Sequence, residues 1–563
     1  MPQCNQCKTQ FEITDADRAF YKKIDVPEPR QCPQCRLVRR LNERNHRTLY
    51  LRTCDKTGKQ IYSQYHTQQP FPVWETNYWW SDKWDATEYG RDFDFSRPFF
   101  EQFKELKHTV PHPALATIPA TIENSDYNNC VGYIKNCYLI AESDYNEDCY
   151  YSNLLKHCKD VCDCSVCYED ELCYECVDCM GCYNVKFSQD CSDCRDSYFL
   201  SDCQTCSDCM GCINQRGKRY MMFNEQLTKE EYTKRSAALH LTTHEGIAHV
   251  RAQAHAFFKT QPHKCAHVKN NQDSSGDHLY NSKNARHCFD SKDLEDCAYC
   301  AKLSLNVKSC MDFNSWGDRA ELVYQSAVCG SNVYNIRFCT TSYTNLSDCT
   351  YCDWCVSSHD LFGCVGLNKK QYCILNKQCT RDEYKALIPR IIEHMKKIGE
   401  WGEFFPKDMC PYGYNESLAQ EIFPLTHEEA LKQGYTWQDN LPMTTGKETL
   451  QLSAIPSDDS FDTDTLAGQI LACTACSRNY KLIKQELVFY KKMRVPVPLN
   501  CPNCRHANRM ALRLPLQLWH RQCMCTLNGH GHTGVCTQEF ETAHAPARPE
   551  KIFCEECYQK KII

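Results

Sequence analysis

Cysteine spacing is the feature of this sequence that most constrains its fold. Residues 130–212 contain 17 cysteines. Many of them recur at a fixed interval, as positions 149, 164 and 179 do. One column consists of Cys149, Cys164, Cys179, Cys194 and Cys209, and a second of Cys137, Ser152, Cys167, Cys182, Ser197 and Cys212. This fifteen-residue interval is too short for a helical-hairpin repeat and is typical of one coil of a β-solenoid. Because stacked coils lie about 4.8 Å apart, each column would form a ladder of like side chains.

The sequence therefore predicts a cysteine-rich β-solenoid over residues 123–218, with one fifteen-residue repeat per coil and the frequent aspartates at its corners. Serine replaces cysteine within the columns, which favours reduced thiols packed as core over metal ligands. Two alternatives remain open. A metal could bridge neighbouring CxxC pairs, and the CxxCxxCxxC runs at 173–182 and 203–212 approximate an iron–sulfur motif without its last, wider gap.

A second solenoid is predicted over residues 264–378. Residues 211–232 match residues 363–384 without a gap, so both solenoids should end in the same strand pair and the same helix. Thr228 and Thr380 are the expected N-caps of those helices, because acidic residues follow them. The cysteine phasing between 264 and 373 is loose, which predicts irregular coils.

The two ends of the chain are an internal duplication. Residues 1–54 and 470–523 align without a gap, so Cys4, Cys7, Cys32 and Cys35 correspond to Cys473, Cys476, Cys501 and Cys504. Each copy has the pattern C-x2-C-x24-C-x2-C, and two such CxxC knuckles supply the four thiolates of a tetrahedral zinc site. Four protein ligands leave no open position, so these zinc ions would be structural. The FYKK segment of each copy is expected to form a short strand.

A third zinc site is predicted near the C-terminus. Five thiols are available there, with His530 and His532 between them. The favoured ligands are Cys525, Cys536, Cys554 and Cys557, with Cys523 as the alternative to Cys525. The N-terminal copy retains only Cys54 of this set, so its second site should have lost the metal. Zinc, about three ions, is the expected cofactor.

Arginines follow the second knuckle of each copy. Arg36, Arg40, Arg44, Arg505, Arg509 and Arg513 could form faces that engage the phosphates of a nucleic acid. They could equally lie on a solvated helix face or pair with acidic residues such as Glu43 and Asp55.

The predicted fold is a multi-domain, mainly β chain with helical inserts, in which treble-clef-like zinc ribbons flank two solenoid-like repeat regions. The expected boundaries follow in chain order. They are an N-terminal zinc module (1–56), an aromatic-rich connector that plugs the first end of the solenoid (57–122), solenoid 1 (123–218), a helical insert (219–263), solenoid 2 (264–378), a helical segment (379–439), a flexible acidic linker (440–469) and a C-terminal double zinc module (470–563).

The start of the chain resembles no secretory signal, and no run of 18 apolar residues occurs. A cytoplasmic protein with reduced thiols, no membrane contact and no evident small-molecule substrate is therefore expected. No P-loop, dinucleotide fingerprint, GxSxG or HExxH motif is present, which argues against an enzyme.

Several motifs resemble those of a group of cysteine-rich proteins from candidate-phylum bacteria. They include CPQCRLVRRLNERN (32–45), SDCMGC (207–212), FGCVGLNKKQYCILN (362–376) and RPEKIFCEECYQK (548–560). The group has no established function, so the resemblance implies no activity. The segment from Cys525 to Cys557 also resembles a zinc ribbon common in those genomes, which implies zinc there.

These observations favour a non-enzymatic, zinc-stabilised scaffold that presents a solenoid surface and its terminal ribbons to a macromolecular partner. A nucleic-acid binder acting through the arginines is the first alternative. An iron–sulfur or thiol redox protein is the second.

Overall fold

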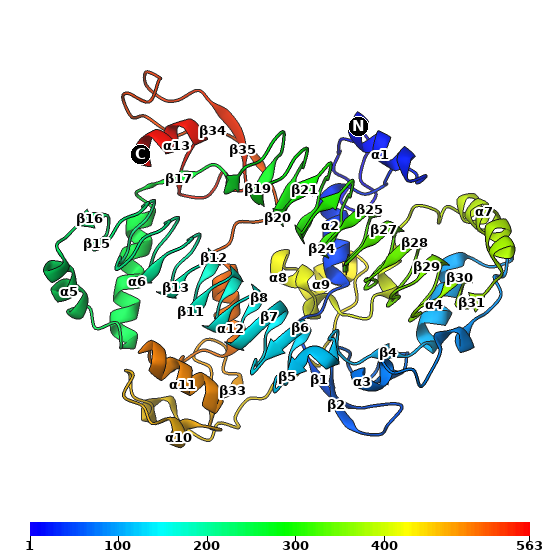
Figure 1. The fold of residues 1–563 in the computed structure, drawn as a ribbon, viewed down its shortest axis with the longest axis horizontal. Coiled ribbons are helices and arrows are strands. Elements are labelled where there is room, and N and C mark those ends of the chain that lie inside the picture. The colour runs from blue at the N-terminus through cyan, green and yellow to red at the C-terminus, as the bar shows by residue number, and fades with distance from the viewer. Residues whose placement is uncertain (563) are drawn as a thin grey trace.

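Two β-solenoids lie side by side in the computed structural model, which describes residues 1–562, and the terminal modules pack against them (Figure 1). The chain runs along the first solenoid, crosses through two helices and returns along the second. The axes are antiparallel, because Asp190 late in the first solenoid contacts His278 early in the second, whereas Glu142 contacts Lys302. Within residues 1–562, no helix combines the length and apolar character needed to span a membrane.

The first solenoid is a parallel stack of short strands. Its strands are β5 (Ile122–Glu123), β6 (Asn129–Lys135), β7 (Ala141–Tyr150), β8 (Asn153–Lys156), β9 (Lys159–Cys162), β10 (Ser165–Tyr168), β11 (Glu171–Tyr174), β12 (Val177–Met180), β13 (Tyr183–Lys186) and β14 (Arg195–Tyr198), followed by the antiparallel hairpin β15 (Met221–Met222) and β16 (Glu225–Gln226).

Each coil of this solenoid is twelve residues long, so the predicted fifteen-residue coil is wrong. Ser165 pairs with Asn153 on one side and with Val177 on the other, which is a step of twelve positions in each direction. Cys167 therefore lies over Cys179, rather than over Cys182 as the predicted column requires. Cys149 pairs with Val161 instead of Cys164.

A three-residue unit explains the error. Every third residue, such as Asp160, Asp163 and Val166, has a positive φ near 55°, and the residue after it points into the core. Aspartate, asparagine and glycine suit this left-handed conformation, as the prediction of corner aspartates anticipated. Four such units close one coil. Each unit forms one of the four sides of a coil. The predicted fifteen-residue interval equals one coil of twelve plus one side of three, so successive cysteines of a predicted column lie on successive sides of the core instead of stacking.

The core thiols are packed as small side chains. Cys164, Cys167 and Cys194 are fully buried, and all cysteines in residues 1–562 are unpaired. The Cys167 thiol lies 3.7 Å from the carbonyl oxygens of both Ser165 and Cys176, the second of which belongs to the next coil. Burial raises the pKa of Cys355 to about 11, so its thiol is protonated at neutral pH. The thiols at these positions pack as core side chains, and the absence of metal from the ladders stays a prediction.

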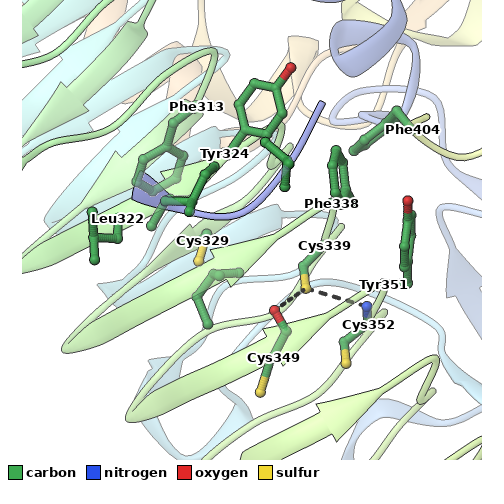
Figure 2. Packing of buried hydrophobic residues seen from close by; sticks show 14 of the residues in the cluster. Phe313, Leu322, Tyr324, Cys329, Phe338, Cys339, Cys349, Tyr351, Cys352 and Phe404 are labelled. Atoms are coloured by element: carbon green, nitrogen blue, oxygen red, sulfur yellow. Dashed lines mark hydrogen bonds between the residues drawn. The ribbon is translucent and has the colours of Figure 1, made fainter. Parts of the chain in front are cut away.

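The second solenoid mixes coils of different lengths, as the loose cysteine phasing predicted, and its first coil is the shortest, since Val268 pairs with Leu279. Leu346 pairs with Val333, thirteen positions before it, whereas Ser347 pairs with His359, twelve positions after it. The extra residue recurs at one corner, where the consecutive positive-φ pairs 305–306, 318–319, 331–332 and 344–345 stack through backbone hydrogen bonds. Figure 2 shows how thiols and aromatic rings fill this core: Phe338 stacks on Tyr351 with centroids 4.9 Å apart, and Cys339 accepts a hydrogen bond from the Cys352 amide.

The strands of the second solenoid are β18 (Val268–Lys269), β19 (Gly276–Tyr280), β20 (Cys288–Lys292), β21 (Leu294–Glu295), β22 (Ala301–Ser304), β23 (Val307–Lys308), β24 (Asn314–Gly317), β25 (Ala320–Tyr324), β26 (Cys329–Gly330), β27 (Val333–Arg337), β28 (Leu346–Thr350), β29 (His359–Phe362), β30 (Gln371–Ile374) and the antiparallel β31 (Lys377–Gln378).

Each solenoid ends in a hairpin and a capped helix, as predicted. Thr228 caps α5 (Lys229–Ala237) and Thr380 caps α7 (Arg381–Ile398), each with a reciprocal bond to a glutamate three residues on. A second helix, α6 (His244–Phe258), packs Val250 and Ala254 against the first solenoid, beside Phe199 and Met210.

The aromatic stretch of the connector packs on the second solenoid, whereas the prediction placed it at the first end of the first solenoid. Only the end of the connector lies there, where Thr117 and Ile122 pair with β6. Phe99 at the start of α4 (Phe99–Thr109) packs on Phe362, and the Arg91 amide donates to the carbonyl of Leu375 in the last coil. An open solenoid end exposes unpaired backbone groups, and this cover satisfies some of them. The other connector elements are β3 (Val73–Trp74), α3 (Thr76–Trp79), η1 (Ala86–Tyr89), β4 (His112–Pro113) and η2 (Pro119–Thr121).

Residues 379–439 continue after α7 in short helices that pack on the N-terminal module, where Tyr414 and Leu418 contact Leu41. These helices are η3 (Lys407–Met409), η4 (Tyr414–Glu416), α8 (Leu418–Ile422) and α9 (His427–Lys432). The segment assigned to an acidic linker contains η5 (Leu452–Ala454) and α10 (Thr463–Leu466). Its Phe461 and Leu466 side chains are buried in the core of the C-terminal module, so apolar burial anchors part of that segment.

Candidate metal centres and their docking

The N-terminal module gathers its four predicted thiols around one point. Cys4 and Cys7 precede α1 (Asp15–Lys23), while Cys32 and Cys35 lie at the start of α2 (Pro33–Asn42), and the four sulfurs lie within 4.8 Å of one another. The Cys7 and Cys32 sulfurs are 3.8 Å apart. Four Zn–S bonds of about 2.3 Å in a tetrahedron place the sulfurs about 3.8 Å apart, so these thiols fit a metal.

The C-terminal copy repeats this arrangement around α11 (Lys484–Met493) and α12 (Pro502–Met510). Cys473, Cys476, Cys501 and Cys504 form the group, and the Cys476 and Cys501 sulfurs are 3.7 Å apart. In both copies the FYKK segment is helical rather than a strand, because α1 and α11 span it.

Amide hydrogen bonds favour the thiolate form in these groups. The amide of Cys32 donates to Cys4 Sγ at 3.3 Å, and that of Cys501 donates to Cys473 Sγ at 3.2 Å. Burial opposes ionisation of Cys473, but this bond and those from neighbouring amides outweigh it and lower its pKa to about 7. A hydrogen bond with Cys35 lowers the pKa of Cys32 to about 6, and the same bond raises the pKa of Cys35. Thiolates are the form that binds metal.

The third group differs from the favoured prediction in one ligand. Its members are Cys523, Cys536, Cys554 and Cys557, so Cys523 takes the place assigned to Cys525. The Cys554 amide donates to Cys523 Sγ at 3.2 Å, the same knuckle bond as in the other two groups. Cys525 lies 3.4 Å from His530 Nδ1 and forms a second, overlapping group of three possible ligands with His532 and Cys557. Because Cys523 and Cys525 lie in one segment with the same residue type, their spacing did not distinguish them.

This difference predicts opposite outcomes for two serine variants. Cys523→Ser removes a ligand and is expected to lower the metal count of the full-length protein by one ion, whereas Cys525→Ser should retain the full count. Native mass spectrometry of the purified variants measures both. Equal counts in the two variants would show that both thiols, or neither, bind the ion.

Around this group, β34 (Trp519–Gln522) pairs with β35 (Glu539–Thr542), and β36 (Lys551–Phe553) leads into α13 (Glu555–Ile562). The N-terminal module has the same hairpin, β1 (Tyr50–Thr53) with β2 (Gln60–Ser63), but aromatic packing surrounds its single cysteine. Cys54 is buried beside Trp74, Trp79 and Trp354. The C-terminal module also contains β32 (Ile470–Ala472) and β33 (Asn479–Lys481), and its β36 pairs with β17 (Pro262–Lys264).

The ribbon arginines are buried ion-pair partners, so the prediction of a phosphate-binding face is wrong. Arg36 on α2 donates to Asp312 of the second solenoid at 2.6 Å, and Arg40 donates to Asn314 and Asp312. Both arginines are at most 1% exposed. Arg44 pairs with Glu142 of the first solenoid.

The C-terminal module docks in the same way on the first solenoid. Arg505 and Arg509 on α12 both pair with Asp163, at 2.9 and 2.7 Å, and Asp163 is fully buried. Arg513 bridges Asp178 of the first solenoid and Asp290 of the second. The helix arginines of each terminal module thus pair mainly with the solenoid that is distant in sequence, while Arg44 and Arg513 also pair with the nearer one. Of the predicted acidic partners, Asp55 pairs with Arg52.

Aromatic residues repeat this docking interface in detail. Tyr490 packs on Tyr174 with centroids 5.8 Å apart, and the equivalent Tyr21 packs on Tyr324 at 5.3 Å. Glu486 accepts a hydrogen bond from Tyr151, as the equivalent Asp17 does from Tyr299. Asp163 and Asp312 both occupy positive-φ corners. The duplication therefore includes the docking surface as well as the module. No pattern among the ribbon residues alone pointed to these aspartates.

Comparison with known proteins adds little. No protein-family model matches the chain, and no curated protein matches it. One solved structure, named "putative acetyltransferase" from Desulfovibrio desulfuricans G20, matches at 10% identity over 50% of this chain and 81% of its own, with a TM-score of 0.11. A score this low carries no argument about fold or function.

Proposed function

We propose that this chain is a non-enzymatic scaffold, in which three structural zinc ions hold the terminal modules and the clamped solenoids present a surface to a macromolecular partner. The buried arginines support this proposal, because their ion pairs with solenoid aspartates attach both modules to the solenoids. Zinc is the proposed ion because sets of four thiolates favour it and leave no position for substrate. In this proposal the ribbons act as clamps, and the solenoids alone present the partner surface.

An exposed aromatic ladder on the first solenoid supports the binding role. Tyr133 stacks on Tyr145 with centroids 4.6 Å apart, and Tyr145 stacks on His157 at 4.9 Å. The two tyrosines are 50% and 46% exposed. Tyrosines are enriched among the residues that dominate binding energy, because they bury a large area at low entropic cost. The proposed partner surface is therefore this ladder.

The ladder predicts a selective loss of binding. Protein carrying Tyr133→Ser and Tyr145→Ser should lose a partner that wild-type protein captures from an extract of its own cells. Tyr334→Ser is the matched control, because Tyr334 is 47% exposed on the second solenoid. Quantitative affinity capture at fixed salt measures the result. Retention of the partner by the double variant, or capture of nothing by wild-type protein, would contradict the proposed surface.

A further inference from the structure

A compact cluster of histidine and aspartate lies where the two solenoids meet, outside the thiol groups. Asp190 comes from a corner of the first solenoid, and His267 and His278 come from the first coils of the second. One ligand atom from each of the three residues lies within 4.8 Å of the others. The cluster is only 11–15% exposed at its side chains, so solvent reaches it but does not fill it.

The Nε2 atoms of His267 and His278 both face the carboxylate of Asp190. His278 Nε2 lies 2.8 Å from Asp190 Oδ1, and His267 Nε2 lies 3.8 Å from Asp190 Oδ2. The rings are stacked, with centroids 4.6 Å apart and an interplanar angle of 19°. Bonds of about 2.0 Å to a tetrahedral ion set ligand atoms about 3.3 Å apart, which is midway between these two distances.

A second carboxylate orients both rings from behind. Asp277 Oδ1 lies 3.2 Å from His267 Nδ1, and Asp277 Oδ2 lies 3.6 Å from His278 Nδ1. The Asp277 side chain is 3% exposed, and its Oδ2 has no hydrogen-bond partner. In metal sites, a carboxylate commonly receives the second N–H of a ligating histidine and fixes the tautomer that frees Nε2.

The charges around the cluster also suit a divalent cation. Asp190 and Asp277 bring two negative charges, which raise the pKa of both His267 and His278 when no ion is bound. The neighbouring Asp178 and Asp290 are already paired with Arg513. A divalent ion bound at both Nε2 atoms would replace the two histidine protons and keep the charge opposite Asp190 and Asp277 at two.

We propose that Asp190, His267 and His278 bind a divalent transition-metal ion that ties the two solenoids together, with Asp277 as the orienting carboxylate. Two imidazoles and a carboxylate suit zinc, cobalt, nickel and iron(II), and water would complete the coordination. This site is independent of the thiolate groups, which contain other residues in other parts of the fold.

Cobalt(II) separates the two kinds of site. Full-length protein whose thiolate sites are filled with zinc is titrated with Co²⁺ and followed by native mass spectrometry and visible absorption. One additional cobalt ion is expected, with weak absorption that lacks the intense sulfur-to-cobalt bands of a thiolate site. Intense bands would instead report cobalt exchanging into a thiolate group and would overturn the assignment of that ion to the cluster.

Variants then locate the ion. His267→Gln with His278→Gln should abolish the additional binding, and Asp277→Asn should weaken it by about 10–100-fold, because it changes only the orienting carboxylate. His287→Gln is the control, since His287 stacks on Tyr299 away from the cluster. Asp190→Asn provides a second ligand test if the double variant does not fold. No additional ion in wild-type protein, or an unchanged ion in the ligand variants, would overturn the proposal.

Discussion

Replacing Asp163 with asparagine is expected to destabilise the docking of the C-terminal module by about 3–5 kcal/mol. The substitution keeps the size of the side chain but removes the charge that both Arg505 and Arg509 face at 2.9 and 2.7 Å. Those arginines are 6% and 3% exposed. An arginine left buried without its partner cannot recover the hydration that it gave up on folding, which makes the loss large.

Hydrogen exchange of α12 and denaturant unfolding of full-length protein measure this loss. Asp312→Asn provides a matched test, because Asp312 faces Arg36 and Arg40 in the duplicated interface. Glu225→Gln is the control: the Glu225–Arg235 pair is exposed at 58% and 44% of its side chains, and its loss should cost at most about 1 kcal/mol. If Asp163→Asn were as mild as this control, the clamp would not depend on the ion pair.

Removing the metal is expected to unfold the two terminal modules and leave the solenoids folded. Structural zinc supplies about 10–16 kcal/mol in small thiolate modules, more than a core of this size provides without it. The solenoid thiols are packed in the cores, and we expect no ion there for a chelator to remove. Amide protection should fall in residues 1–53 and 470–562 and persist in residues 123–218.

Hydrogen exchange with mass spectrometry, with and without chelator in the presence of a reductant, tests this expectation. Cys4→Ser with Cys7→Ser should reproduce the N-terminal part alone and leave the C-terminal module protected. Elemental analysis identifies the ion, for which three zinc ions are expected in the thiolate groups. Loss of protection in the solenoids on chelation would show that their ladders bind metal, and bound iron with sulfide would indicate an electron-transfer protein.

The metal-ligand groups show which ligands the cysteine spacing could identify and which it could not. Two CxxC knuckles at a fixed separation identified Cys4, Cys7, Cys32 and Cys35 and their equivalents, because a knuckle is a local turn that its own residues specify. The third group required a choice between Cys523 and Cys525. That choice depends on which sulfur meets the amide of Cys554, a residue that is distant from both of them in the chain.

The arginines illustrate the opposite limit. Their spacing at the surface of α2 and α12 is the same whether they face phosphates, water or carboxylates. Asp163 and Asp312 lie far from them in the sequence, and only packing of the modules on the solenoids brings the charges together.

The sequence by itself determined the repeating, cysteine-rich character of the solenoids, the duplication of the modules and the residue types inside and at the corners. These features follow from local backbone preference, since aspartate and asparagine tolerate a positive φ and small thiols fit a narrow core. The number of units per coil was decided by the tertiary structure alone. Coils of twelve and of fifteen residues are both multiples of three, so the cysteine spacing is compatible with either length. The strand pairing between coils shows that the first solenoid has twelve residues per coil. Long-range packing likewise decided that the arginines clamp the molecule, because burial creates charge partners that no local pattern specifies.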